Sequence, residues 1–101
     1  MKPLVIMNGV TADGSGTTHN LYSESNDQMK CYNLVVEGDL GGGTLTLQGA
    51  VEGGSLQTMR EADGTGVTIS ALGCYTMTLA NIDFNVVLAG SSGANVTVTV
   101  V

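Results

Sequence analysis

The chain has 101 residues, of which 43% are hydrophobic, so a single domain with one modest core is expected. Only 12% of the residues are charged, and the formal net charge is −6 with three Lys and Arg in total. Because so few positive charges cannot offset a phosphate backbone, this composition argues against a nucleic-acid-binding protein.

Apolar and polar residues alternate along most of the chain, as is typical of half-buried β-strands, and no window keeps a helical period. In chain order, the predicted strands are 3–7, a short one at 19–23, 31–37, 44–51, 66–70, 74–80, 83–88 and 95–101. Their apolar sides predict a core that contains Leu45, Leu47, Val67, Ile69, Met77, Leu79, Phe84, Val86, Val98 and Val100.

Turn signals separate these strands, among them Asn8-Gly9, Asp13-Gly14, Gly53-Gly54 and Asp63-Gly64. Glycine supplies positive φ angles, and Asn and Asp tolerate them, so such pairs close hairpins. Seven to nine short strands at regular spacing predict an all-β fold. We expect residues 1–101 to form a single antiparallel β-sandwich or jelly roll.

The stretch from Gly38 to Gly54 holds seven glycines in seventeen residues and raises the question of a phosphate-binding loop. A Walker-type loop needs a Lys and a Ser or Thr after its last glycine, and then a helix. Here Gly43 is followed by Thr44, with no lysine, and by an alternating strand. We therefore interpret the stretch as turn, strand, turn.

The N-terminal sequence MKPLVIMNGV has one lysine and about five apolar residues, too few for the core of a secretory signal. No stretch approaches the roughly 18 apolar residues of a transmembrane helix. A soluble product made inside a cell is expected. In a reducing compartment Cys31 and Cys74 are interpreted as two small thiols, with their pairing left open.

The sequence assigns no catalytic, cofactor-binding or metal-ligating residue. His19 is the only histidine and is interpreted as a polar residue at a loop edge. An enzyme would need His19 within hydrogen-bond distance of Cys31, Cys74 or an acid in a cleft. A calcium site built from separate loops stays open, with the candidate ligands Asp13, Glu24, Asp27 and Asp63.

Charge is distributed unevenly along the chain. Eleven of the twelve charged residues lie between Lys2 and Asp63, and Asp83 is the only one from Gly64 to Val101. The terminal run NVTVTVV is flat, β-prone and uncharged, which is hazardous for an exposed edge strand. We expect another copy or another protein to cover it. The alternative is a central strand that is paired on both edges.

Three stretches resemble the small β-sandwich structural proteins of tailed-phage virions: GGGTLTLQGAVEGGSLQTM, GVTISALGCYTMTL and FNVVLAGSSGANVTVTVV. In those proteins a Gly-Thr strand ending in Gln leads into an Asp-Gly-Gly or Glu-Gly-Gly hairpin. A Gly-x-Tyr strand and a final Val-Thr-Val-Thr-Val strand follow. The likeness covers residues 35–101. Glu52 stands where those proteins commonly have Asp, and their Trp near Leu56 or Gln57 is absent.

The resemblance implies a non-enzymatic structural component of a phage particle, most simply a capsid decoration or cement protein that stabilises the head by multivalent contacts. It also implies a homo-oligomer in the virion, made in the host cytoplasm. Its partners would be the major capsid protein or another virion protein, with no nucleic acid, membrane or cofactor. The candidate contact residues are Asn95, Val96, Thr97, Val98, Thr99, Val100 and Val101.

The alternative is a tail or fibre appendage module that binds host-surface carbohydrate or anchors a receptor-binding protein. Sugar-binding sandwiches present aromatic rings on which sugars stack. This chain has no Trp, one Phe and three Tyr. Clustering of Tyr22, Tyr32 or Tyr75 on one exposed rim would favour this alternative.

Overall fold

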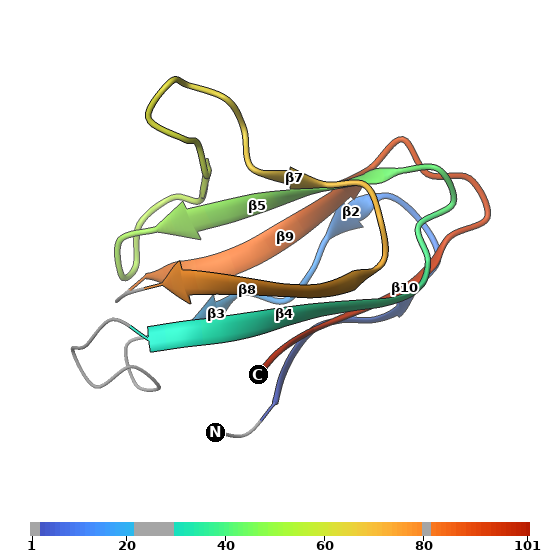
Figure 1. The fold of residues 1–101 in the computed structure, drawn as a ribbon, viewed down its shortest axis with the longest axis horizontal. Coiled ribbons are helices and arrows are strands. Elements are labelled where there is room, and N and C mark those ends of the chain that lie inside the picture. The colour runs from blue at the N-terminus through green and yellow to red at the C-terminus, as the bar shows by residue number, and fades with distance from the viewer. Residues whose placement is uncertain (1–2, 22–29, 80–81) are drawn as a thin grey trace.

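A computed structural model describes residues 3–21, 30–79 and 82–101, except for the side chains of Lys30, Cys31 and Leu79 (Figure 1). The described chain forms ten β-strands and no helix. The strands are β1 (Leu4–Val10), β2 (Gly14–Ser15), β3 (His19–Asn20), β4 (Lys30–Asp39), β5 (Thr44–Ala50), β6 (Gln57–Thr58), β7 (Thr68–Ile69), β8 (Gly73–Leu79), β9 (Asp83–Ala89) and β10 (Asn95–Val100).

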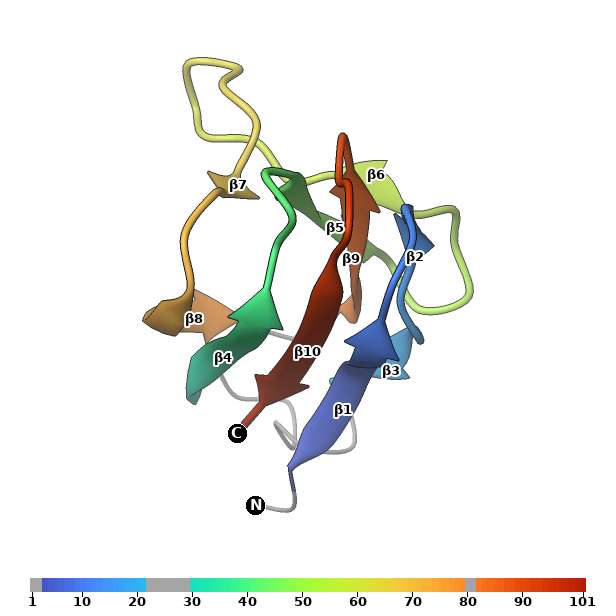
Figure 2. The same cartoon turned by 90° about the vertical axis from the view of Figure 1, so that its right-hand side faces the viewer.

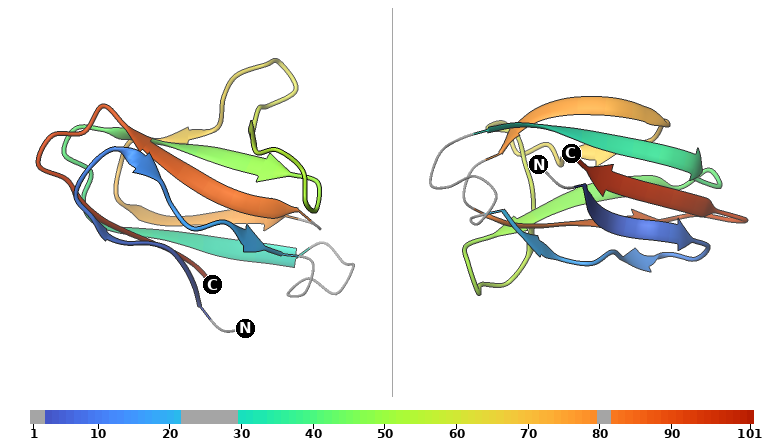
Figure 3. Two further views of the ribbon diagram at one scale, coloured as in Figure 1. Left: turned by 180° about the vertical axis from the view of Figure 1, so that it is seen from behind. Right: turned by 90° about the horizontal axis from the view of Figure 1, so that it is seen from below.

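The strands form two antiparallel sheets that pack face to face. The first sheet has the order β1-β10-β4-β8, which Figure 2 shows from its outer side. The second sheet has the order β2-β9-β5-β6, with β3 also beside β9 and β7 also beside β5. The prediction of an all-β sandwich is confirmed. Figure 3 shows the strands of both sheets from behind and from below.

The core lies between the sheets, and most of the predicted core residues are confirmed there. The predicted residues that are buried are Leu45, Leu47, Ile69, Phe84, Val86, Val98 and Val100. Val67 and Met77 are half-buried against the same cluster, and the side chain of Leu79 lies outside the described part. Strict alternation in β5, β9 and β10 therefore sends one side chain in two into the core.

The glycine-rich stretch 38–54 is turn, strand, turn, as predicted. Gly41 and Gly42 form a turn with φ angles of +61° and +75°, and an Asp39 Oδ1 accepts the Gly41 N–H at 2.7 Å. This turn carries the chain from β4 in the first sheet to β5 in the second. Gly38, at φ +97°, allows a close strand approach: a Cβ there would lie 2.0 Å from the Asn95 carbonyl oxygen.

The C-terminal strand β10 is central in its sheet. It pairs with β1 on one edge and with β4 on the other. The expectation that β10 offers an open edge to a partner is therefore wrong, and the central-strand alternative holds. Sequence alone could not decide this because strand order depends on pairings between residues far apart in the chain.

Residues 14–20 run beside β9 in two short pieces, β2 and β3, with a gap opposite Asn85 (Figure 3). The Asn85 side chain fills this gap. It is the one buried polar side chain of the described residues, with 2% of its surface exposed. Its Nδ2 donates to Gly16 O and Thr18 Oγ1, each at 3.0 Å, and its Oδ1 accepts from Val86 N at 2.8 Å. Asn85 thus replaces the ladder bonds that the interrupted strand lacks.

Candidate functional site

His19 lies in β3 and is half-buried. Its Nε2 is 3.0 Å from the carbonyl oxygen of Val5 in β1. The ring thereby joins the second sheet to the edge strand of the first sheet. This contact gives His19 a structural partner within the fold. No cavity or cleft is detected among the described residues.

The two cysteines lie on the neighbouring strands β4 and β8. Cys31 is opposite Thr78, whereas Cys74 is opposite Val35, so the two are four register positions apart. Four strand residues span about 13 Å, and a disulfide needs Cα atoms within about 7 Å. The register therefore excludes a disulfide between them within one chain. Cys74 is a free, exposed thiol.

Asp13 holds the loop that joins β9 to β10. Its carboxylate accepts hydrogen bonds from Gly90 N and Ser91 N, each at 3.0 Å, and from the Ser91 hydroxyl. The Ser91 hydroxyl, followed by the Ser91 N–H, lowers the pKa of Asp13 below its ordinary value. Because an ionised carboxylate is the better acceptor, these bonds favour the charged form.

Asp63 has a local role in the turn between β6 and β7. Its Oδ1 accepts the N–H of Thr65 at 2.9 Å, and this bond, with a second one to the Thr65 side chain, lowers the pKa of Asp63. Asp13 and Asp63 thus hold two different loops. Glu24 and Asp27 lie outside the described residues. Among the residues that the structure describes, no three His, Cys, Asp or Glu side chains come together as a metal site would require.

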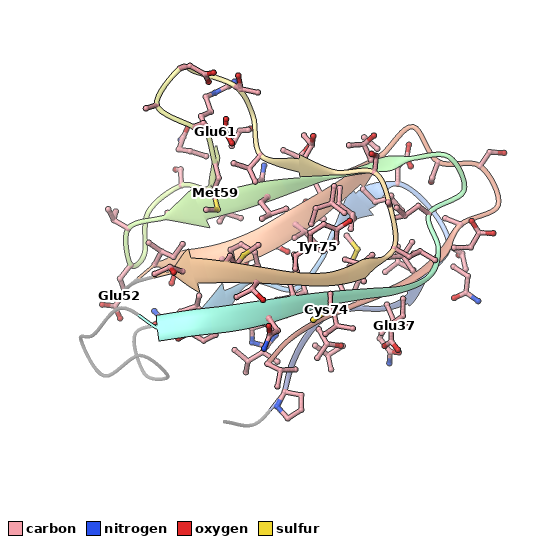
Figure 4. The ribbon with its side chains drawn as sticks, in the orientation of Figure 1. Glu37, Glu52, Met59, Glu61, Cys74 and Tyr75 are labelled. Carbon is pink, nitrogen blue, oxygen red and sulfur yellow. The ribbon has the colours of Figure 1, made fainter. Side chains whose placement is uncertain are left out.

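The tyrosines form no exposed aromatic cluster in the described part of the chain. Tyr32 is buried in the core, with 1% of its surface exposed. Tyr75 points from β8 toward the opposite sheet, and its hydroxyl donates to the Ala71 carbonyl (Figure 4). Tyr22 lies outside the described residues. The rim that would favour a carbohydrate-binding module is not formed by Tyr32 and Tyr75.

The predicted contact residues of β10 divide between the core and the outer side of the first sheet. Val96, Val98 and Val100 are buried in the core of their own chain. Thr97 and Thr99 are half-buried on the outer side, and Asn95 and Val101 are exposed. A partner could therefore reach β10 only through the outward-facing side chains. Contact with a partner stays a prediction for these four residues.

We call the outer side of the first sheet the Thr/Val face. Its central row crosses all four strands and consists of Val5, Thr99, Val35 and Cys74, which are opposite one another in register. Asn33 and Thr76 form the next row, in which the Thr76 hydroxyl donates to Asn33 Oδ1 at 3.0 Å. Glu37 brings charge to one end of this face, one residue beyond the last β4–β8 pair, and Figure 4 labels it near Cys74.

The outer side of the second sheet is similarly uncharged at its centre. One row across it consists of Ser15, Val87, Thr46 and Thr68. Most of the charged side chains that the structure describes lie in turns or at strand ends, among them Asp13, Glu52, Arg60, Glu61 and Asp63. Charge in the described residues is therefore concentrated in turns and at strand ends, whereas the centres of the outer strand faces carry Thr and Val.

Sequence reasoning missed the edge strand β8. Its sequence GCYTMTL is as uncharged as that of β10, but only the strand order shows that β8 lies at an edge. The lack of charge in both strands indicated a strand that contacts a partner. Only the strand order shows that β8, and not β10, is the edge strand.

The described residues include no apolar helix of the length that crossing a bilayer requires. No family model, curated protein or solved structure matches the chain.

Proposed function

We propose that the chain is a non-enzymatic structural component of a phage particle, namely a capsid decoration protein. The virion context rests on the resemblance of residues 35–101 to small virion sandwiches. The mode of action, adhesion through a sheet face, rests on the charge pattern of the strands. In this proposal each copy binds weakly and many copies act together on one shell.

The observation that supports the proposal is the lack of charge at the centre of both outer strand faces. Typical soluble domains have about 25% Lys, Arg, Glu and Asp, whereas this chain has 12%. The central row of the Thr/Val face instead has two aliphatic side chains, a threonine and a thiol. Covering such a row costs less desolvation than covering Lys or Glu, because no charge must be taken from water.

The Thr/Val face is the side that we assign to the shell. Val5, on the edge strand β1, is 45% exposed, and Val101, after the end of β10, is 41% exposed, which leaves apolar surface available for burial. β10 and β4 keep an unbroken register over six residue pairs beneath this face. The charged turns at Glu52 and Arg60 would then face solvent or a neighbouring protein.

An add-back assay with phage heads prepared without the chain tests this assignment. Thr99→Lys places an ammonium in the central row, and Thr68→Lys places the same charge on the other sheet as the matched control. Thr97 is unsuitable because its hydroxyl accepts the Gly9 N–H at 3.1 Å and so has a role within the fold. Both variants should unfold at the same midpoint temperature as the parent protein.

We expect the parent and Thr68→Lys to sediment with the heads, and Thr99→Lys to bind at least about tenfold more weakly, because a buried ammonium without a partner is costly. Equal binding of all three proteins would remove the Thr/Val face from the contact. A parent that fails to bind heads would contradict the decoration role itself.

A further inference from the structure

β8 forms one edge of the first sheet and has no strand beside it on its outer edge in the described residues (Figure 2). We propose that this free edge is a self-association site, at which β8 of a second copy adds as an antiparallel strand. The proposal goes beyond a role in a virion and does not depend on it, since it concerns only the pairing of two copies in solution.

The register shows which backbone groups of β8 point outward. Asn33 exchanges two hydrogen bonds of 2.9 Å with Val101, so its N–H and C=O point toward β10. Alternate residues of a strand point the opposite way, so Leu34 directs its backbone groups toward Tyr75 of β8. Cys74 and Thr76 must then direct theirs to the open edge.

No backbone hydrogen bond joins Cys74 or Thr76 to a described segment across this edge. Their side chains are exposed as well, so nothing described in this part of the chain shields the edge. An exposed row of N–H and C=O groups is a template for another strand. β8 offers such groups at Cys74 and Thr76, in a strand with no charge, no proline and no register shift.

The other edges are protected. β1, at the far side of the first sheet, has two register shifts and is capped by Thr17 N, which donates to Ile6 O, and by His19 at Val5 O. The second sheet ends in strands of only two residues, at β2 and β3 on one side and at β6 and β7 on the other. Short and bulged strands are common protections against edge pairing, and β8 has neither.

A second copy of this chain fits the β8 edge best. The strand has no charge to attract a partner of opposite sign, and no like charges meet when two copies of it pair, despite a net charge of −6. A two-fold axis at Thr76 sets that residue opposite its own copy, a Thr–Thr pair that is favourable across strands. This symmetric contact also closes both open edges at once.

Head-to-tail association of β8 with β1 of another copy is disfavoured because β1 is shifted in register and already capped. The dimer would therefore contain one continuous sheet of eight strands, with the Thr/Val faces of both copies on the same side. Pairing along one edge buries far less than the roughly 1,200–2,000 Å² of a stable interface. We therefore expect dissociation constants of about 0.1–1 mM for the free chain.

Charge-swap variants at Thr76 test the site. Thr76→Lys and Thr76→Glu should each weaken dimerisation at least about tenfold, because two like charges would face each other across the axis. An equimolar mixture should recover association to within about threefold of the parent. Sedimentation velocity from 0.05 to 2 mM gives the constants, and far-UV circular dichroism checks the fold.

The matched control is the pair Thr99→Lys and Thr99→Glu, which puts the same charges on the same face but in the central strand β10. These two variants should dimerise as the parent does. Thr76→Pro provides a second route, because its missing N–H is the one that points to the open edge, so pairing with β4 is kept.

A parent that stays monomeric at 2 mM would overturn the proposal. So would dimerisation of Thr76→Pro with the parent's constant, or an equal loss of association in the Thr99 variants. If both Thr76 charge variants lose association and the mixture fails to recover it, the two-fold axis at Thr76 is wrong. None of these results depends on phage heads, so they are separate from a failure of the decoration role.

Discussion

Replacing Asn85 by aspartate tests the claim that this side chain holds the interrupted strand 14–20 against β9. The parent amide donates from Nδ2 to Gly16 O and Thr18 Oγ1 and accepts at Oδ1 from Val86 N. In Asn85→Asp the shape is kept, but at neutral pH the group that faced Gly16 O becomes an acceptor. The Thr18 hydroxyl can rotate to donate, whereas the Gly16 carbonyl cannot.

The expected loss of unfolding free energy at pH 7 is about 2–4 kcal/mol. A buried polar group without its partner costs about 1–3 kcal/mol, and burial of the new carboxylate adds to that. This is a large part of the about 5–15 kcal/mol that holds a typical domain together.

The pH dependence separates hydrogen bonding from packing. Burial raises the pKa of the introduced carboxyl in the folded state above its unfolded value, so the folded variant binds more protons. Its stability relative to the parent should therefore rise as pH falls through that raised pKa, because the protonated group can donate to Gly16 O again. Urea unfolding of both proteins at pH 7 and pH 4.5 gives the difference at each pH. An unchanged difference, or one below about 1 kcal/mol at pH 7, would refute the reasoning.

Three further predictions follow from single contacts. Phe84→Ala removes a fully buried ring and should cost about 3–5 kcal/mol in urea unfolding; a loss below about 1 kcal/mol would contradict its core position. His19→Ala, for which sequence alone predicts almost unaltered stability, should instead cost about 0.5–1.5 kcal/mol by the same assay, because it removes the contact to Val5 O. Asp13→Asn should melt below the parent at pH 7, and the gap should narrow below about pH 4 as the parent carboxylate, whose pKa is lowered by Ser91, is protonated. A difference in melting temperature that stays constant down to pH 2 would show that the charge of Asp13 does not contribute to stability.

Local pattern was sufficient for the class of the fold and for much of its core. Alternation in β5 and β9 predicted the burial of Leu45, Leu47, Phe84 and Val86, because the side-chain period of a strand is two wherever the strand lies. Turn chemistry likewise predicted the role of the glycines at 41–43. Neither signal depends on which strands are neighbours.

Strand order could not be read from the sequence. β8 and β10 are both uncharged and alternate Thr with apolar residues, yet one is an edge strand and the other is central. The burial of Asn85 was missed for a related reason. Its position in β9 is on the outward side by alternation, and it is buried only because residues 16–18, nearly 70 positions earlier, cover it.

The sequence predicted an uncharged contact surface in the second half of the chain, but it did not predict which strand forms the open edge. The missing charge between Gly64 and Val101 pointed to contact through the second half of the chain. The topology moves the open edge from β10 to β8 and leaves β10 only its outward threonines. A contact of His19 with a backbone carbonyl leaves no trace in sequence, because any exposed carbonyl could have met the ring.

Cross-linking mass spectrometry of gradient-purified phage particles that contain the chain tests the central claim, a structural role through uncharged strand surfaces, most directly. The account predicts a copy number in fixed proportion to the major capsid protein. Cross-links should join the charged turns at Glu52 and Arg60 to neighbouring chains. A thiol reagent added to intact particles should not label Cys74. Absence of the chain from purified particles, or free labelling of Cys74 in every copy that is present, would contradict it.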